Sequence, residues 1–136
     1  MYILDTCTCI DFLRGRLPNI QQMVAATDPL LFGIPAIVEA ELRIGVEKSS
    51  NPTKERQRVD LFLSAFQILP FDSSCAKAYA GTRAELEAAG TPIGPLDTLI
   101  AATALAHHAT LVTSNAKEFT RVSHLHVETW EEIAWN

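Results

Sequence analysis

The chain has 136 residues, 48% of them hydrophobic and 20% charged, so we expect a single globular domain spanning residues 1–136. No segment approaches the roughly eighteen apolar residues of a membrane-spanning helix, and the N-terminal residues show no export signal, so we expect no membrane association. The net charge of −5 excludes a surface that attracts nucleic acid everywhere, but it leaves room for a local basic patch.

The three cysteines are Cys7, Cys9 and Cys75. Their odd number, with two of them only two residues apart, argues against a disulfide framework and favours a reducing cytoplasm. A Cys-x-Cys pair without a second pair or a nearby histidine is a poor zinc signature. We therefore predict a cytoplasmic protein whose cysteines are small core residues.

Short apolar runs alternate with helical patterns along the chain. The expected strands are 2–4, 30–34, 67–71, 110–112 and 126–128. The expected helices are a short one that ends at Leu13, a segment from Pro18, 35–48, a segment from Pro52, 73–89 and 95–106. Thr6 or Thr8 is the expected cap of the first helix. The C-terminal tail is expected to be anchored by Trp130, Ile133 and Trp135.

This alternation predicts an α/β fold with right-handed crossovers and a central, mostly parallel sheet of four to five strands covered on both faces. In such sheets ligands bind beyond the carboxyl ends of the strands, where the topology switches. Asp5 and Asn115 each follow the end of a predicted strand, so both are candidates for that crevice.

Two helices carry carboxylates where apolar side chains are expected. Asp97 is the only charged residue of the helix from Pro95, whose core-facing stripe is expected to include Leu96 and Ile100. Glu41 is expected to point into the apolar face of its helix, because helical geometry places it between Ile37 and Ile44, whereas Glu39 and Glu47 should face solvent.

Asp5, Glu41 and Asp97 would form a costly cluster if they converged without a counter-charge. Two carboxylates about 4 Å apart repel by roughly 4 kcal/mol at an effective dielectric constant near 20. Either one carboxylate is protonated or a cation lies between them. All-oxygen ligation favours Mg²⁺ or Mn²⁺ over zinc, and phosphoryl transfer is the chemistry that such a site does best.

Each candidate also has a purely structural interpretation. Asp5 could cap the following helix, Asp97 could interact with the helix dipole, and Glu41 could reach the helix edge. Asn115 could be a turn residue and Glu118 an exposed acid. The four histidines are assigned to structure. Five basic residues either contact an RNA backbone or form a solvated helix face: Arg43, Lys48, Lys54, Arg56 and Arg58.

Four motifs in order resemble the PIN-domain family, and most closely its VapC toxins, the ribonucleases of type II toxin–antitoxin pairs. They are Leu4-Asp5-Thr6, Ala40-Glu41-Leu42 with Gly45 and Glu47-Lys48-Ser49, Gly94-Pro95-Leu96-Asp97, and the segment from Val112 to Phe119. The resemblance covers essentially the full length. It implies a PIN-like α/β/α sandwich, a magnesium-dependent endoribonuclease, a homodimer, and an antitoxin whose C-terminal segment occludes the site.

The resemblance also implies roles for individual residues. Asp5, Glu41 and Asp97 match the three metal-binding acids of the family. Asn115 stands where many members have an acid, and Glu118 is a nearby substitute, so we expect one well-held Mg²⁺.

We expect RNA hydrolysis that inhibits translation, with tRNA as one candidate substrate and with 5′-phosphate and 3′-hydroxyl products. Thr6 and Thr113 would orient carboxylates or phosphate. The alternatives are a catalytically inactive protein-binding module and a small metal-dependent phosphatase. An aspartyl-phosphate phosphatase would need an acid two residues after Asp5, where Cys7 stands.

Overall fold

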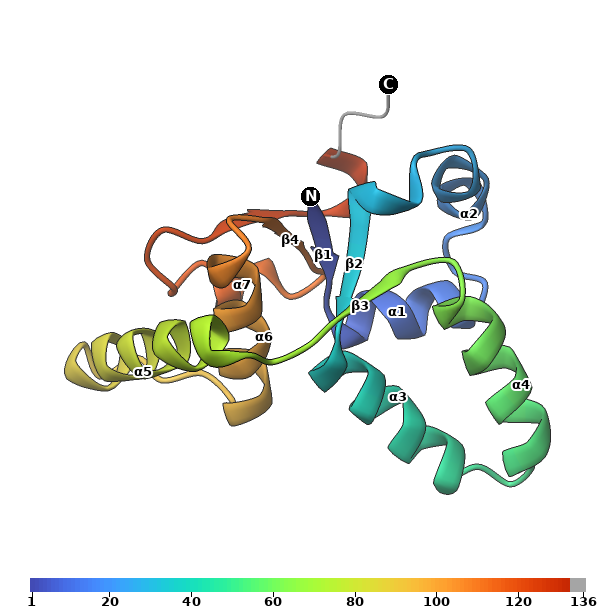
Figure 1. The fold of residues 1–136 in the computed structure, drawn as a ribbon, viewed down its shortest axis with the longest axis horizontal. Coiled ribbons are helices and arrows are strands. Elements are labelled where there is room, and N and C mark those ends of the chain that lie inside the picture. Colours follow the sequence, from blue (N-terminus) through green and yellow to red (C-terminus); the bar gives the residue numbers. More distant parts are fainter. Residues whose placement is uncertain (133–136) are drawn as a thin grey trace.

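The computed structural model describes residues 1–132, which form a sheet flanked by helices (Figure 1). In chain order the elements are β1 (Tyr2–Leu4), α1 (Thr6–Leu13), α2 (Pro18–Ala25), a 3₁₀ turn (Pro29–Leu31), β2 (Phe32–Pro35), α3 (Ala36–Glu47), α4 (Pro52–Leu63), β3 (Gln67–Leu69), α5 (Ser73–Ala88), α6 (Pro95–Ala106), β4 (Thr110–Val112), α7 (Ala116–Phe119), β5 (His126–Glu128) and a second 3₁₀ turn (Trp130–Glu132).

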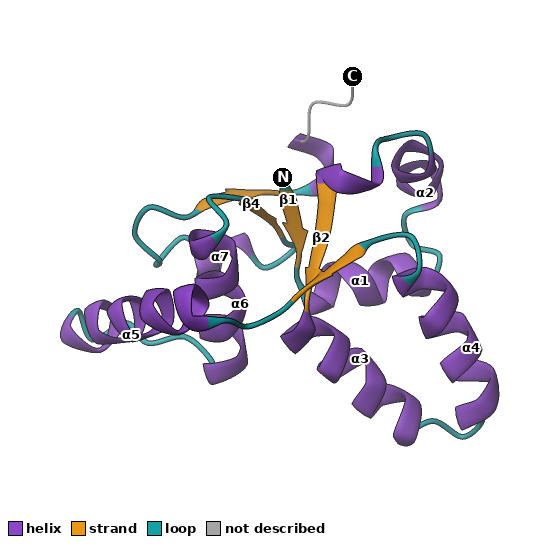
Figure 2. Cartoon of the chain, viewed as in Figure 1, coloured by secondary structure: helices purple, strands orange, loops and turns teal. Residues whose placement is uncertain are grey.

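The sheet has five strands in the order β3-β2-β1-β4-β5, and every neighbouring pair is parallel. The predicted parallel α/β architecture is therefore confirmed. α1 to α4 gather on one side of the strands and α5 to α7 on the other (Figure 2). From β1 the chain adds β2 and then β3 on one side, and it later returns to add β4 and β5 on the other side of β1. The topology therefore switches beside β1, and ligand sites form at such switch points.

Helix boundaries follow local sequence signals. Asn51 and Asp72 accept hydrogen bonds from the first turns of α4 and α5, as expected of N-cap residues. Gly15 and Gly90 adopt φ of 68° and 70° just beyond α1 and α5, a conformation that glycine reaches without steric cost. Of the caps considered for α1, Asp5 is the one observed, and the prediction of Thr6 or Thr8 was wrong.

An aromatic cluster fills the core between α1, α4 and the sheet. The ring of Phe12 lies 5.2 Å from that of Phe62, and the ring of Phe32 lies 5.9 Å from that of Trp130. Trp130 is buried, as predicted for a residue that anchors the C-terminal segment. The other two predicted anchors, Ile133 and Trp135, lie outside the described residues.

Three sequence predictions about burial were wrong. Leu96 is 46% exposed because the buried face of α6 is formed by Thr98, Ile100 and the alanines after it. Leu30 belongs to a 3₁₀ turn before β2 and is exposed. Cys7 is exposed, whereas Cys9 and Cys75 are buried, and all three thiols are free. Within residues 1–132, no helix has the length and apolar character needed to cross a bilayer.

Candidate functional site

Asp5 lies at the carboxyl end of β1, directly beside the end of β4. It is 2% exposed, and its carboxylate accepts hydrogen bonds from the Thr113 hydroxyl and, at 2.9 Å, from the backbone N–H of Thr8. Burial raises the pKa of Asp5, and these hydrogen bonds from Thr113 and Thr8 oppose the rise. Asp5 therefore caps α1 and also places a carboxylate at the switch point, so its structural and functional interpretations are compatible.

Glu41 lies beside the core of α3 rather than inside it. The buried side of α3 is formed by Val38, Leu42 and Val46, so the prediction that Glu41 points into the apolar face was wrong. Glu41 is half-buried and accepts a 2.7 Å hydrogen bond from the Thr6 hydroxyl. Because Thr6 directly follows Asp5, this bond ties α3 to the end of β1.

Asp97 lies in the first turn of α6 and is the acid whose protonation is most perturbed. Its pKa is raised from 3.8 to about 6, first by burial and then by the charges of Glu118, Asp5 and Glu41. Within residues 1–132 its carboxylate accepts no hydrogen bond from another group. The structure therefore brings together acids that are far apart in the sequence, and their charges repel.

Asn115 and Glu118 lie in the segment that follows β4. The Asn115 side-chain amide donates to Glu118 Oε2 at 2.8 Å, and the other oxygen, Oε1, accepts from the Gly94 backbone N–H at 3.1 Å. The Asn115 backbone N–H donates to the Thr113 hydroxyl oxygen at 2.8 Å. Both candidates for the fourth position are thus engaged with protein groups around the acids.

The donor set suits a hard divalent cation. The acids around Asp97 supply oxygen ligands only, and burial of these charges favours a positive partner. In the part of the chain that is described, no three acidic, histidine or cysteine side chains form a ready-made metal cage. A hydrated divalent cation can be held by only one or two carboxylates, so the arrangement fits a hydrated ion better than a fully protein-ligated one.

Cys7 belongs to the surroundings of the site, which the sequence interpretation missed. Burial raises the pKa of its thiol, and the negative charges of Asp5, Asp97, Asp11 and Glu41 raise it further. The signal was present in the sequence, since Cys7 is two residues after Asp5 in the first turn of α1. A protonated, exposed thiol thus reports on the charge of the acid cluster.

The five predicted RNA contacts are not equally free to bind phosphate. Three already hold acidic partners: Arg43 with Glu39 and Asp60 at 2.8 and 2.9 Å, Arg56 with Glu47 at 3.4 Å, and Arg58 with Glu55 at 3.0 Å. Lys48 and Lys54 are exposed and have no ion pair within residues 1–132. The two lysines are therefore the most available cations of the group, because they break no ion pair when they bind phosphate.

Two hollows lie among α1 to α4, and Glu41 lines one of them. One of about 340 Å³ lies between α1, α3 and α4 and is lined by Glu41, Arg14, Ser49 and Arg58 among others. The other, of about 520 Å³, lies between α1, α2 and α4, and apolar residues such as Phe12, Val24 and Leu61 line much of it. Arg58 and Leu13 line both hollows, so the two hollows are neighbours.

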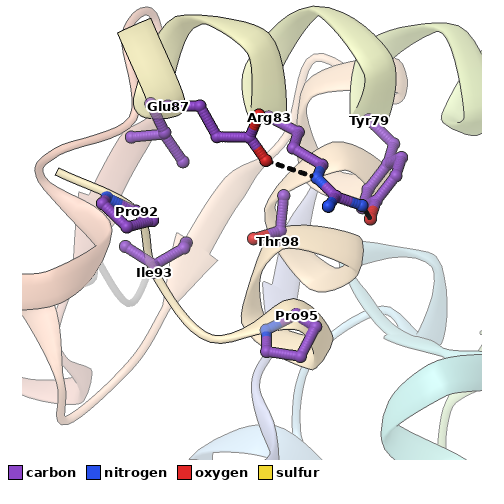
Figure 3. Close-up of a pocket in the computed structure, with 8 residues that line it drawn as sticks. Tyr79, Arg83, Glu87, Pro92, Ile93, Pro95 and Thr98 are labelled. Atoms are coloured by element: carbon purple, nitrogen blue, oxygen red, sulfur yellow. Dashed lines mark hydrogen bonds and ion pairs between the residues drawn. The ribbon is translucent and has the colours of Figure 1, made fainter. Parts of the chain in front are cut away.

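A third hollow, of about 290 Å³, lies on the other flank of α6. Figure 3 shows Arg83 between Tyr79 and Glu87, to which it donates hydrogen bonds at 3.0 and 2.7 Å. Pro92 and Pro95 line the opposite wall. None of the candidate acids lines this hollow, so it is not part of the candidate site.

The sequence model of the PIN domain matches residues 2–125. The chain is 38% identical to Ribonuclease VapC2 of Rickettsia felis, over 97% of this chain and 99% of that protein. It is 33% identical to the tRNA(fMet)-specific endonuclease VapC of Salmonella typhimurium, over 95% of this chain and 97% of that protein.

Solved structures agree with these similarities. The crystal structure of DNA-bound VapBC from Salmonella typhimurium matches with a TM-score of 0.90 and 33% identity, covering 95% of this chain and 97% of that chain. VapBC2 from Rickettsia felis, bound to a promoter DNA fragment, matches with a TM-score of 0.85 and 37% identity, covering 95% of this chain and 98% of that chain. The chain therefore belongs to the PIN-domain family and is of its VapC ribonuclease type.

Proposed function

We propose that this protein is a Mg²⁺-dependent endoribonuclease toxin that hydrolyses RNA phosphodiester bonds, inhibits translation, and is neutralised by a cognate antitoxin. The observation that carries the proposal is the gathering of acids around Asp97, whose pKa is raised to about 6 by burial and then by the charges of Glu118, Asp5 and Glu41. Two relatives are named tRNA(fMet)-specific endonucleases, which makes a tRNA the first substrate to test. We propose that the protein acts in the cytoplasm, where tRNA is found.

Asp5, Glu41 and Asp97 would hold the ion, directly or through water. When bound, Mg²⁺ polarises the phosphodiester and lowers the pKa of a coordinated water. Thr113 and Thr8 fix the orientation of the Asp5 carboxylate, and Thr6 fixes that of Glu41. These bonds keep two carboxylates in place before the ion arrives, which limits the reorganisation that binding requires.

We assign the antitoxin to the apolar groove of about 520 Å³ between α1, α2 and α4. Leu61 lines this groove together with other apolar residues and is 76% exposed, so it offers an apolar contact to a partner. The similarity of this chain to the VapC proteins of VapBC complexes supports this occupant, and the groove neighbours the hollow that Glu41 lines, because Arg58 lines both. We expect Leu61→Ser to weaken antitoxin binding and leave RNA cleavage intact, with Ile68→Ser as the exposed control.

The activity is tested by incubating the protein with total RNA and with purified tRNA. We expect cleavage with Mg²⁺, none with EDTA, and recovery when Mg²⁺ or Mn²⁺ is added back. Asp97→Asn should abolish cleavage in a protein that remains folded by circular dichroism. Magnesium-dependent cleavage that survives Asp97→Asn would overturn the catalytic assignment, and size-exclusion chromatography with light scattering tests the expected homodimer.

A further inference from the structure

One continuous path of hydrogen bonds joins two acids of the site across the segment after β4. The Thr113 hydroxyl donates to Asp5, and its oxygen accepts from the Asn115 backbone N–H. The Asn115 side chain donates to Glu118, whose other oxygen accepts from the Gly94 N–H. In each of these four hydrogen bonds an N–H or O–H group faces an oxygen that can accept it.

The far end of the path is the start of the helix that carries Asp97. The Gly94 carbonyl accepts hydrogen bonds at 2.9 Å from both the backbone N–H and the hydroxyl of Thr98. Gly94 is thus the N-cap residue that begins α6. Asp97 lies within that first turn, and a side chain added at Gly94 would have its Cβ 3.7 Å from Asp97 Oδ2. The position of Gly94 therefore sets the position of the Asp97 carboxylate.

The segment that forms the path is itself anchored. Phe119 of α7 is 1% exposed, which fixes the short helix against the core. Arg121 adds a second contact to the same approach to α6, because it donates to the Pro92 carbonyl at 3.3 Å. Hence the chain before α6 is held at two places, by Arg121 at Pro92 and by Glu118 at Gly94, and the contact with Glu118 is the one nearer to Asp97.

We infer that Thr113, Asn115 and Glu118 form a hydrogen-bonded bridge that sets the separation of the Asp5 and Asp97 carboxylates. Asn115 and Glu118 are positioning residues in this bridge rather than metal ligands. In this chain the amide at position 115 matches Glu118, because a carboxylate can only accept hydrogen bonds and the Asn115 amide donates one. The assignment rests on the proposed nuclease function for its catalytic consequence, and on the hydrogen bonds alone for its structural one.

The test exchanges the two polar groups. In Glu118→Gln, a side chain with one acceptor faces two donors, so one hydrogen bond is lost. We expect RNA cleavage to fall about 10- to 100-fold, as for other groups that orient metal ligands. In the double variant Asn115→Asp/Glu118→Gln, the glutamine donates to the new carboxylate at position 115 and accepts from Gly94, so both bonds and the net charge are restored. Most of the lost activity should return.

A second readout does not depend on metal or on cleavage. The exchange of the Gly94 amide proton with solvent, followed by NMR in the metal-free protein, should accelerate in Glu118→Gln and slow again in the double variant. Glu85→Gln, which removes an exposed carboxylate of α5, is the control and should change neither quantity. Thermal unfolding identifies any variant that has lost its fold.

Three results would overturn the bridge. The first is unchanged exchange of the Gly94 amide proton in Glu118→Gln. The second is a double variant that is no more active than Glu118→Gln. The third is an Asn115→Asp variant as active as the original protein, because the carboxylates at positions 115 and 118 should then repel each other. If the original protein does not cleave RNA at all, the proposed function fails, while Gly94 exchange still decides the bridge.

Discussion

Replacing Asp97 by asparagine should stabilise the metal-free protein while it abolishes activity. The pKa of Asp97 is about 6 in the folded chain against an ordinary value of 3.8, because burial and the charge of Glu118 disfavour its ionised form. At about 1.4 kcal/mol per pH unit, this difference sets an upper bound of about 3 kcal/mol on the destabilisation by the charge.

Two effects reduce that bound. The carboxylate gains about 0.3–1 kcal/mol from its place in the first turn of α6, and its partial exposure lets solvent screen the repulsion. We therefore expect Asp97→Asn to raise the free energy of unfolding by about 1 kcal/mol at pH 7.5 in EDTA, which corresponds to about 4 °C in Tm.

The pH dependence gives the sign of the effect. Between about pH 4 and 6 the folded protein binds a proton at Asp97 that the unfolded chain releases, so its stability falls as the pH rises through this window. The stability gap between the two proteins should open across the same window and stay constant above it. Thermal and urea unfolding from about pH 4 to 8 measure the gap, with Glu85→Gln as the control.

Magnesium should reverse the order. A ligand at 100 times its Kd stabilises a folded protein by about 2.7 kcal/mol, which exceeds the expected advantage of the asparagine. With saturating Mg²⁺ the original protein should therefore be the more stable. The reasoning is refuted if Asp97→Asn is the less stable protein in EDTA at pH 7.5, or if the gap does not change with pH.

Three further predictions follow from the same geometry. Cys7 should react slowly with iodoacetamide at pH 7.5, because burial and the surrounding acids raise the pKa of its thiol. Mg²⁺ should accelerate the reaction. A reaction rate that does not change with Mg²⁺ would argue against metal binding beside Cys7. Thr113→Val should destabilise the protein by about 1–3 kcal/mol in urea unfolding, because it leaves the buried Asp5 without one donor, whereas Thr113→Ser should keep most of the stability. Replacing both Lys48 and Lys54 by serine, in the inactive Asp97→Asn protein, should weaken the salt dependence of single-stranded RNA binding. The slope of log K against log salt concentration should fall by about 1.4. An equal fall when the paired Arg56 and Arg58 are replaced by serine would refute the view that the two lysines are the more available cations.

The acid site was predicted in part from the sequence. Asp5 and Asp97 were recognisable because each is a charge beside or within an apolar element, which is costly without a functional or capping reason. The resemblance added support for Glu41 and drew attention to Glu118. What it did not give was the orientation of α3, because Glu41 flanks both the apolar residues that became its core and those that became exposed.

The sequence alone determined the order and type of the elements, since periodicity, caps such as Asn51 and Asp72, and the glycines at 15 and 90 act within a few residues of the chain. Only the tertiary structure decided how the acids are held. Glu118 meets the Gly94 amide 24 residues away, and Thr113 meets Asp5 across 108 residues. Such bonds depend on which strands become neighbours and on how the helices rotate against the sheet, and no local pattern encodes either.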